Sequence, residues 1–397
     1  MSDSKSPNLV YFNTSFVNDY NSATSLASNL YVPAATTLFR NQPVVDIPED
    51  YYVSVIRMEV DASAIPITLF PISVVNGVPQ GPDNNYFIVS IVTAAQPSNP
   101  VGVIYVPSTT ATLPADYAPV YSYQEFINQI NTALLTAFNN VTIKPSGYTI
   151  APYLYMDDNT NIISLVTQSQ YADGNMKIWF NTPLYQFFYN FNMTYQPLLN
   201  GQSTVSQPLN YGFRIGYNGN NLYTNTFVDI NNPPNLIASA LKTSQEFQNL
   251  QAWQVLRKII LTSNLPVIVE GAQLGTQNTV TSSNKYLPIL TDYAVPVDVS
   301  VGASRSTLIY LPTAEYRLTS MQGKSGLTSL SFQISWEDRY QNIRPVLIGP
   351  SEGFNLKLLF RKKNFNGPFE SKEDQMVDEK NKEIIYGEKL RKLKYLN

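Results

Sequence analysis

The stretch that decides the fold covers residues 329–363 and reads "SLSFQISWEDRYQNIRPVLIGPSEGFNLKLLFRKK". In its first part, apolar residues from Leu330 to Trp336 alternate strictly with serine and glutamine. This alternation is typical of a β-strand that buries one of its faces. A second short apolar run, "RPVLIG", follows the charged segment "EDRYQNI". The stretch therefore predicts a hairpin whose seven-residue charged loop forms a solvent-facing tip.

Two adjacent carboxylates in this loop, Glu337 and Asp338, raise the question of an acid/base site. A catalytic carboxylate pair flanks one substrate, with the two groups about 5–9 Å apart. Adjacent residues on a strand point to opposite faces, so this pair is poorly placed to cooperate. The sequence favours a structural loop tip over a catalytic pair.

Short runs of the same kind recur along the chain, each rich in β-branched or aromatic residues and followed by turn residues. They cover residues 51–60, 85–94, 101–107, 161–168 and 176–181. The chain also holds 27 prolines and 27 tyrosines, which suit strand ends and half-buried sheets, respectively. These features predict an all-β fold, either a sandwich or a barrel.

Two segments break the β pattern and predict helices. Residues 123–138 place apolar side chains on one helical stripe, and Ser122 with Glu125 forms a capping-box pattern before it. The segment "TPLYQFFYNF" predicts a shorter helix, with Thr182 as N-cap and Pro183 at the first helical position. Such helices can cover an open end of a β-sandwich.

The segment "AWQVLRKIILTSNLPVIVEGA", from residue 252, predicts a second hairpin with its turn at residues 263–264. Strand alternation places Trp253 and Arg257 on one face and Lys258 on the other. The region between residues 200 and 235 is instead rich in Asn, Gly, Tyr and Gln, which indicates loops or short exposed strands.

Composition excludes several classes of active site. The 397 residues include no histidine and no cysteine, which excludes thiolate or imidazole metal sites and Ser-His-Asp arrangements. Charged residues make up 14% and the net charge is −3, so Asn, Gln, Ser and Thr supply much of the polar surface. We predict a protein that is not an enzyme, with no catalytic, cofactor-binding or metal-binding residues.

Two further polar motifs carry no site. Asp157, Asn159 and Asn161 resemble the start of a calcium loop, but the glycine and the closing acidic ligand are missing, so a turn between strands is predicted. The basic cluster at residues 361–363 lacks an aromatic-lined basic groove, and we expect no direct nucleic-acid binding by the body of the protein.

The two ends of the chain also allow predictions about export and about mobility. The N-terminus lacks a secretory signal pattern, and no apolar run reaches the length of a membrane span. By contrast, the last 37 residues hold 10 of the 26 Lys and Arg together with 7 acidic residues. We therefore expect residues 364–397 to form a mobile or partner-dependent charged tail.

An ordered series of motifs resembles the penton, or minor capsid, proteins of virophages and polinton-like viruses. The motifs are "AWQVLRKIILTSNLPVIVEG", "LPILTDYAVPV", "TLIYLPTAEYRLTSM", "GLTSLSFQISWEDR" and "GFNLKLLFRKK", with "IPEDYYVSVIRMEVDASAIPITLFPI" near the start. Together they cover most of residues 45–363. The departures are the charged tail, and Ala314 with Glu315 where small turn residues are expected.

The resemblance implies a single jelly roll, five copies of which close a vertex of an icosahedral shell. The implied layout is an N-terminal arm (1–44), the first part of the jelly roll (45–199), a loop-rich insertion or outer region (200–235), C-terminal strands completing the sandwich (236–363) and the tail (364–397). The implied partners are four further copies, the neighbouring major capsid protein, and a host receptor or glycan. The implied location is the virion vertex, after assembly in the host cytoplasm or viral factory.

The sequence is also compatible with other functions. A major capsid subunit would share the β-fold, although double jelly rolls need two repeats of one pattern and only one is visible. A carbohydrate-binding sandwich would share the tyrosines and asparagines and would present a shallow aromatic platform. A glycan-cleaving enzyme would need two carboxylates facing one cleft.

Overall fold

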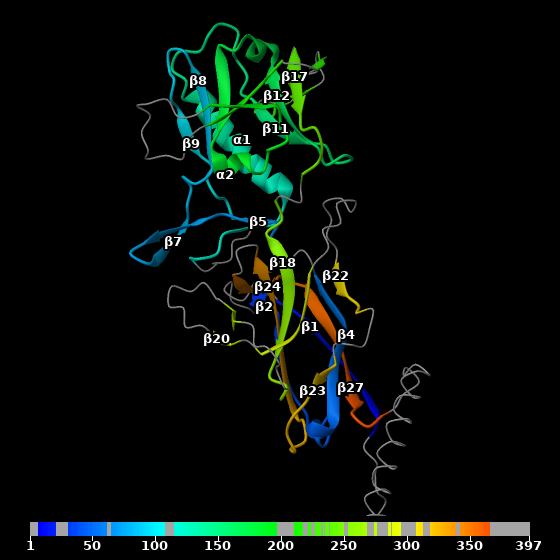
Figure 1. The fold of residues 1–397 in the computed structure, drawn as a ribbon. Helices are drawn as coiled ribbons and strands as arrows, with labels where there is room; N and C mark the ends of the chain where they lie inside the picture. The colour runs from blue at the N-terminus through cyan, green and yellow to red at the C-terminus, as the bar shows by residue number, and fades with distance from the viewer. Residues whose placement is uncertain are drawn as a thin grey trace, which may run out of the picture.

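The structure is a computed structural model. It describes residues 7–20, 31–61, 65–107, 115–196, 210–216, 221–223, 227–231, 233, 235–237, 239–249, 253–267, 274–275, 285–286, 288–294, 307–312, 318–338 and 342–365. Figure 1 shows two bodies of structure, one above the other, which are joined through the segments next to β5 and β18.

The lower body is a sandwich of two antiparallel sheets. One sheet has the order β1 (Leu9–Val17), β27 (Gly353–Lys362), β4 (Tyr51–Asp61) and β22 (Thr307–Tyr310). The other has the order β3 (Ala35–Phe39), β24 (Ser329–Asp338), β18 (Leu256–Ser263) and β21 (Ile289–Ala294). Counted along the chain, these eight strands follow the orders 1-8-3-6 and 2-7-4-5. That interleaving of early and late strands is the jelly-roll topology, so the predicted all-β, single jelly-roll fold is confirmed.

Short strands extend the sandwich at its ends. They are β23 (Thr319–Ser320), which pairs with β4; β25 (Ile343–Pro345), which pairs with β24; β2 (Val32–Pro33) with β26 (Leu347–Ile348); and β19 (Leu274–Gly275) with β20 (Lys285–Tyr286). A single-turn 3₁₀ helix, η2 (Pro48–Asp50), leads into β4. The predicted hairpin of residues 329–363 is confirmed as β24 and β25, while residues 339–341 of its loop lie outside the described residues.

The upper body is built from the chain between β4 and β18. Its first sheet has the order β14 (Met193–Tyr195), β15 (Tyr211–Phe213), β13 (Met176–Phe180), β8 (Ile88–Thr93) and β9 (Pro100–Gly102). Its second sheet has the order β11 (Tyr153–Met156), β12 (Ile163–Gln168), β17 (Ala240–Ser244) and β16 (Asn221–Tyr223). Two small pairs are β5 (Thr68–Leu69) with β10 (Pro119–Val120), and β6 (Ile72–Val75) with β7 (Val78–Pro82). The helices are α1 (Tyr123–Asn139), α2 (Thr182–Tyr185) and the 3₁₀ helix η4 (Ser169–Asp173). Helix α1 contacts both sheets, through β8, β9 and β11.

Each body has its own large hydrophobic core. The upper core draws its buried residues from Ile67 to Trp253, and the lower core draws its residues from both ends of the chain, from Phe12 to Phe360. The sequence assigns residues 1–44 to an arm. The described part of this segment supplies β1 and β3, which complete the two sheets of the sandwich. The upper core also extends well beyond the expected insertion at residues 200–235.

The predicted long helix is confirmed, and its capping differs in detail. Glu125 Oε2 accepts a hydrogen bond from the Tyr121 amide at 3.3 Å, but the Ser122 side chain makes no capping bond. The short helix begins one residue earlier than predicted. Its N-cap is Asn181, whose side chain accepts from the Leu184 amide at 3.3 Å and also from the Ile88 amide at 3.1 Å. The Asn181 side chain therefore both caps the helix and ties it to β8.

The second predicted hairpin is wrong in its pairing. Strand β18 forms as expected, but its partners are β21 and β24, which come later in the chain. After residues 263–264 the chain makes an isolated bridge from Val267 to Met321, and residues 268–270 lie outside the described part. Periodicity reveals a strand but does not reveal a distant partner.

The predicted charged tail, residues 364–397, lies outside the described residues apart from residues 364 and 365.

Aromatic rings fill the upper core around Trp253. This side chain is fully buried and lies edge-to-face against Phe126 at 5.4 Å and Phe187 at 5.2 Å between ring centroids. Its indole Nε1 donates to the Phe187 carbonyl at 3.0 Å. Trp253 lies three residues before the start of β18, so its packing holds the last part of the upper body next to the sandwich.

We predict that Trp253→Ala lowers the free energy of unfolding of the upper body by about 3–5 kcal/mol, because a large cavity replaces a packed ring. Phe247→Ala is the control, since Phe247 is 52% exposed, and its effect is expected to stay below about 1 kcal/mol. Urea titration followed by circular dichroism measures both. Equal losses for the two variants would contradict the assignment of Trp253 to this core.

Candidate functional site

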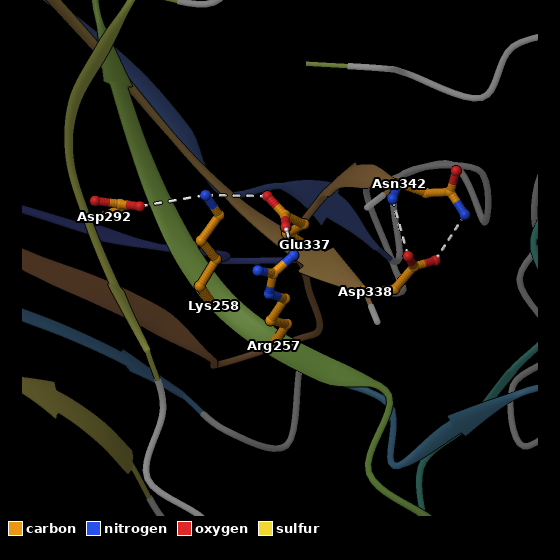
Figure 2. Close-up of polar contacts among 6 residues, drawn as sticks. All are labelled: Arg257, Lys258, Asp292, Glu337, Asp338 and Asn342. Carbon is orange, nitrogen blue, oxygen red and sulfur yellow. Dashed lines mark hydrogen bonds and ion pairs between the residues drawn. The ribbon is translucent and has the colours of Figure 1, made fainter. Parts of the chain in front are cut away.

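The described residues with the densest charge pairing lie on β18, β21 and β24 of the sandwich (Figure 2). Leu256 and Lys258 on β18 oppose Asp338 and Glu337, which are adjacent on β24, so Arg257 is an extra residue in a β-bulge. The bulge changes the direction of the side chains. As a result Arg257 and Lys258 both contact Glu337, although simple alternation places them on opposite faces.

The ion pairs use both carboxylate oxygens of Glu337. Arg257 Nη1 lies 3.1 Å from Oε1, and Lys258 Nζ lies 3.1 Å from Oε2. Lys258 Nζ also lies 3.3 Å from Asp292 Oδ2 on β21. The Glu337 and Lys258 side chains are 5% and 12% exposed, so water screens the pair weakly. Two cations balance two carboxylates, and the cluster joins three neighbouring strands.

Asp338 faces a different neighbourhood, as expected for the next residue on a strand. Its Oδ1 accepts from the Asn342 amide at 2.8 Å, and its Oδ2 accepts from Asn342 Nδ2 at 2.9 Å (Figure 2). The prediction of a solvent-exposed tip is wrong for both acids, because Glu337 is 3% and Asp338 1% exposed. Paired cations and the Asn342 amides compensate for their burial, so the two carboxylates form two separate structural contacts.

A second polar contact joins the sandwich to the upper body. Arg344 on β25 donates from Nη1 to the Asp116 carbonyl at 3.3 Å, and its guanidinium lies 5.5 Å from the centroid of the Tyr117 ring. Burial raises the pKa of the Tyr117 hydroxyl, which therefore stays neutral. The contact places a planar cation against an aromatic ring where the chain returns to α1.

The other polar motifs are also structural. The predicted turn at Asp157 is confirmed: its Oδ1 accepts from the Asn159 and Thr160 amides at 3.0 and 2.9 Å between β11 and β12. The Thr160 hydrogen bonds hold the Asp157 pKa below its usual value. At the end of β27, Lys363 Nζ donates to the Met321 carbonyl at 3.3 Å. Across the described residues, no group of three acidic side chains lies close enough together to hold a metal ion.

A surface pocket of about 280 Å³ lies at one end of the β1–β27–β4–β22 sheet, where β1 and β4 end and β27 and β22 begin. Its apolar walls come from Phe16, Val17 and Ile309, and its polar rim includes Glu59 and Asp61. The sequence carries no local signal for this pocket because its walls come from strands that are distant in sequence. None of the helices in the described part of the chain has the length and apolar character of a membrane span.

We predict that Glu337→Gln lowers the free energy of unfolding by about 3 kcal/mol, because Lys258 loses a buried charge partner. Glu59→Gln is the matched control. It breaks the Arg57–Glu59 pair, whose arginine side chain is 53% exposed, and should cost less than about 1 kcal/mol. Chemical denaturation of both variants measures the difference. A loss for Glu337→Gln as small as that of the control would contradict a stabilising role for the cluster.

Comparisons with known proteins identify relatives with the same architecture. The family model described as Sputnik minor capsid protein V18/19 matches residues 10–362. Structural protein V19 of Sputnik virophage is 26% identical over 216 residues, which cover 53% of this chain and 94% of that protein. The protein V18 of the same virophage, described as uncharacterized, is 30% identical over 146 residues, or 32% of this chain and 82% of that protein.

Two solved structures share the fold. A chain of the Sputnik virophage structure determined by cryo-EM superposes with a TM-score of 0.69 and 25% identity, covering 90% of this chain and 98% of that chain. The mavirus penton protein superposes with a TM-score of 0.57 and 14% identity, covering 89% and 99%. These findings confirm the resemblance inferred from the ordered motifs. The chain belongs to the Sputnik minor capsid protein V18/19 family and is a structural protein of the viral capsid.

Proposed function

We propose that this minor capsid protein forms the vertex of an icosahedral virion as a ring of five copies, each in contact with the neighbouring major capsid protein. The match to the minor capsid family over residues 10–362 carries this proposal. The fold likeness to the mavirus penton protein, over nearly the whole length of both chains, supports it. A head-to-tail ring needs two different complementary patches on each subunit, and a sandwich with two unlike sheets supplies two unlike faces.

We also propose a division into two domains. The jelly roll, residues 7–61 and 254–365, would make the shell contacts, and residues 65–253 would form an outer domain inserted between β4 and β18. The separate hydrophobic cores support this division. The tail after residue 365 would contact neighbouring shell proteins, and assembly would take place in the host cytoplasm or viral factory.

The proposed role involves no catalysis. The chain has neither histidine nor cysteine. Two of the most deeply buried acids, Glu337 and Asp338, are engaged by Arg257, Lys258 and Asn342. A catalytic carboxylate needs one face open to a substrate, so the pairing of these acids favours a structural role.

The proposed ring predicts the mass of the assembled protein. Size-exclusion chromatography with light scattering on the full chain is expected to give five times the subunit mass of 44.5 kDa. A trimer would instead favour a major capsid subunit, and a monomer at all concentrations would contradict the vertex proposal. Negative-stain images of the same fractions should show five-fold rings.

A second candidate function, binding of a host glycan, rests on an aromatic strip of the upper body. The strip consists of Tyr185, Tyr189, Tyr195, Tyr211 and Phe247. The rings of Tyr185 and Tyr211 stack at 3.6 Å between centroids, and Tyr195 packs against Tyr211 at 5.4 Å. Tyr195 is 58% and Phe247 52% exposed. Exposed aromatic faces next to polar groups suit the apolar faces of sugar rings.

We predict that Tyr195→Ala weakens glycan binding by about two- to tenfold, since one stacking ring is lost. Tyr155→Ala is the matched control, because Tyr155 lies on β11 of the same body, is 41% exposed and lies outside the strip. A glycan array followed by saturation-transfer NMR on the full chain measures both. No binding by the unaltered chain, or equal losses in both variants, would rule out the strip as a receptor site.

A further inference from the structure

The hairpin of β6 and β7 exposes apolar side chains on both of its faces. Val74, Val75 and Val78 are 56%, 54% and 56% exposed. Asn76 and Gly77 form its turn with φ angles of 50° and 78°, as a two-residue hairpin turn requires. Within the described part of the chain these two strands pair only with each other. An isolated two-stranded hairpin is marginally stable in water, so this one gains stability when its valines are covered.

The strand edge of β7 is poorly suited to accept another strand. Pro79 and Pro82 lie in β7 and lack the amide hydrogens that a neighbouring strand would need. The hairpin can therefore associate through its valine side chains without extending the sheet at β7. Its base is held firmly, because the Asp83 amide donates to the Pro71 carbonyl at 2.8 Å and Ile72 packs against the upper core.

The pocket at the end of the β1–β27–β4–β22 sheet has an exposed apolar part beside polar residues. Its volume of about 280 Å³ is at the small end for ligand sites, and its apolar walls include Val17 and Ile309, which are 58% and 53% exposed. The acids at its rim already have partners: Asp61 Oδ2 accepts from the Gly353 amide at 2.7 Å, and Glu59 pairs with Arg57. Val17 and Ile309 are thus the exposed apolar part of the pocket, beside the polar Thr307, Ser351 and Asn355, and they suit small aliphatic side chains.

The hairpin and β22, which lines the pocket, lie on opposite sides of the molecule in Figure 1. Figure 1 shows the hairpin, labelled β7, projecting to one side just above the sandwich, whereas β22 lies on the other side at a similar level. The pocket is lined by Thr307 and Ile309 of β22 together with the adjoining end of β4. Complementary patches at one level on opposite sides allow identical subunits to close a flat ring, because a difference in level would produce a helix.

We infer that the β6–β7 hairpin of one subunit inserts Val75 and Val78, which pair across its turn and lie on one face, into the pocket of the next copy of this chain. The inference rests on the proposed ring and names the contact that would hold it together. A single contact of this kind, repeated around the ring, uses each hairpin and each pocket once. It would cover Val75 and Val78 of every subunit.

Disulfide trapping tests the contact, because the natural chain has no cysteine and any disulfide reports the introduced pair alone. We expect the double variant Val75→Cys with Ile309→Cys to form covalent oligomers up to the closed ring on a non-reducing gel. In one subunit the two positions lie on opposite sides, so a bond within a chain is not expected. Either single variant on its own is the control and should not produce the series of covalent oligomers that extends up to the closed ring.

A second variant tests the same contact without cross-linking. Val75→Asp is expected to weaken ring formation by at least about tenfold, because it would place a charge against apolar walls. Val106→Asp is the matched control, since Val106 is 57% exposed outside the hairpin, and it should leave association unchanged. Circular dichroism melting checks that both variants fold.

The outcomes separate this inference from the proposed function. A ring that forms normally in Val75→Asp, or that yields no cross-link in the double variant, overturns the hairpin contact and leaves the vertex role standing. If the unaltered chain forms no ring at all, both proposals fail. Cross-links that stop at a dimer contradict a closed head-to-tail ring.

Discussion

One backbone hydrogen bond, from the Val255 amide to the Ile67 carbonyl at 3.1 Å, lies where the two bodies of the molecule meet. The chain leaves the sandwich shortly before Ile67 and re-enters it at Val255, so this bond fixes the two connections side by side. Ile67 belongs to the upper core and Val255 to the lower core. Arg344 reinforces the same junction through the Asp116 carbonyl and the Tyr117 ring. The relative placement of the two cores therefore depends on short-range contacts between segments far apart in sequence.

The buried charges serve the sandwich in a similar way. Glu337 holds Arg257 and Lys258, and Lys258 also reaches Asp292, so the pairs tie β18 to both of its neighbours. Breaking a buried pair is costly because an unpaired charge remains in a weakly screened site. This cost discourages slippage of β18 against β24, where a shift of one residue would separate the charges. In a jelly roll with distant partners, such specific contacts help to define the register.

Much of the fold could be predicted from the sequence. Alternating runs identified β24 and β18, and the helical stripe with Glu125 identified α1 almost to the residue. Local patterns could not reveal that β1 pairs with β27 across almost the whole chain. The bulge at Arg257 was also hidden, and it reverses the expected directions of the side chains. The Asn76-Gly77 dipeptide between valines is a hairpin signal in the sequence, but this hairpin was not among the predictions.

The prolines of β7 have a consequence for the protein before assembly. Exposed valines beside the edge of β7 that is unpaired in the described part of the chain favour open-ended stacking into fibres. Pro79 and Pro82 deprive that strand of the amides on which such growth depends. The hairpin therefore keeps exposed valines for side-chain contacts without offering the β7 edge as a template for fibres.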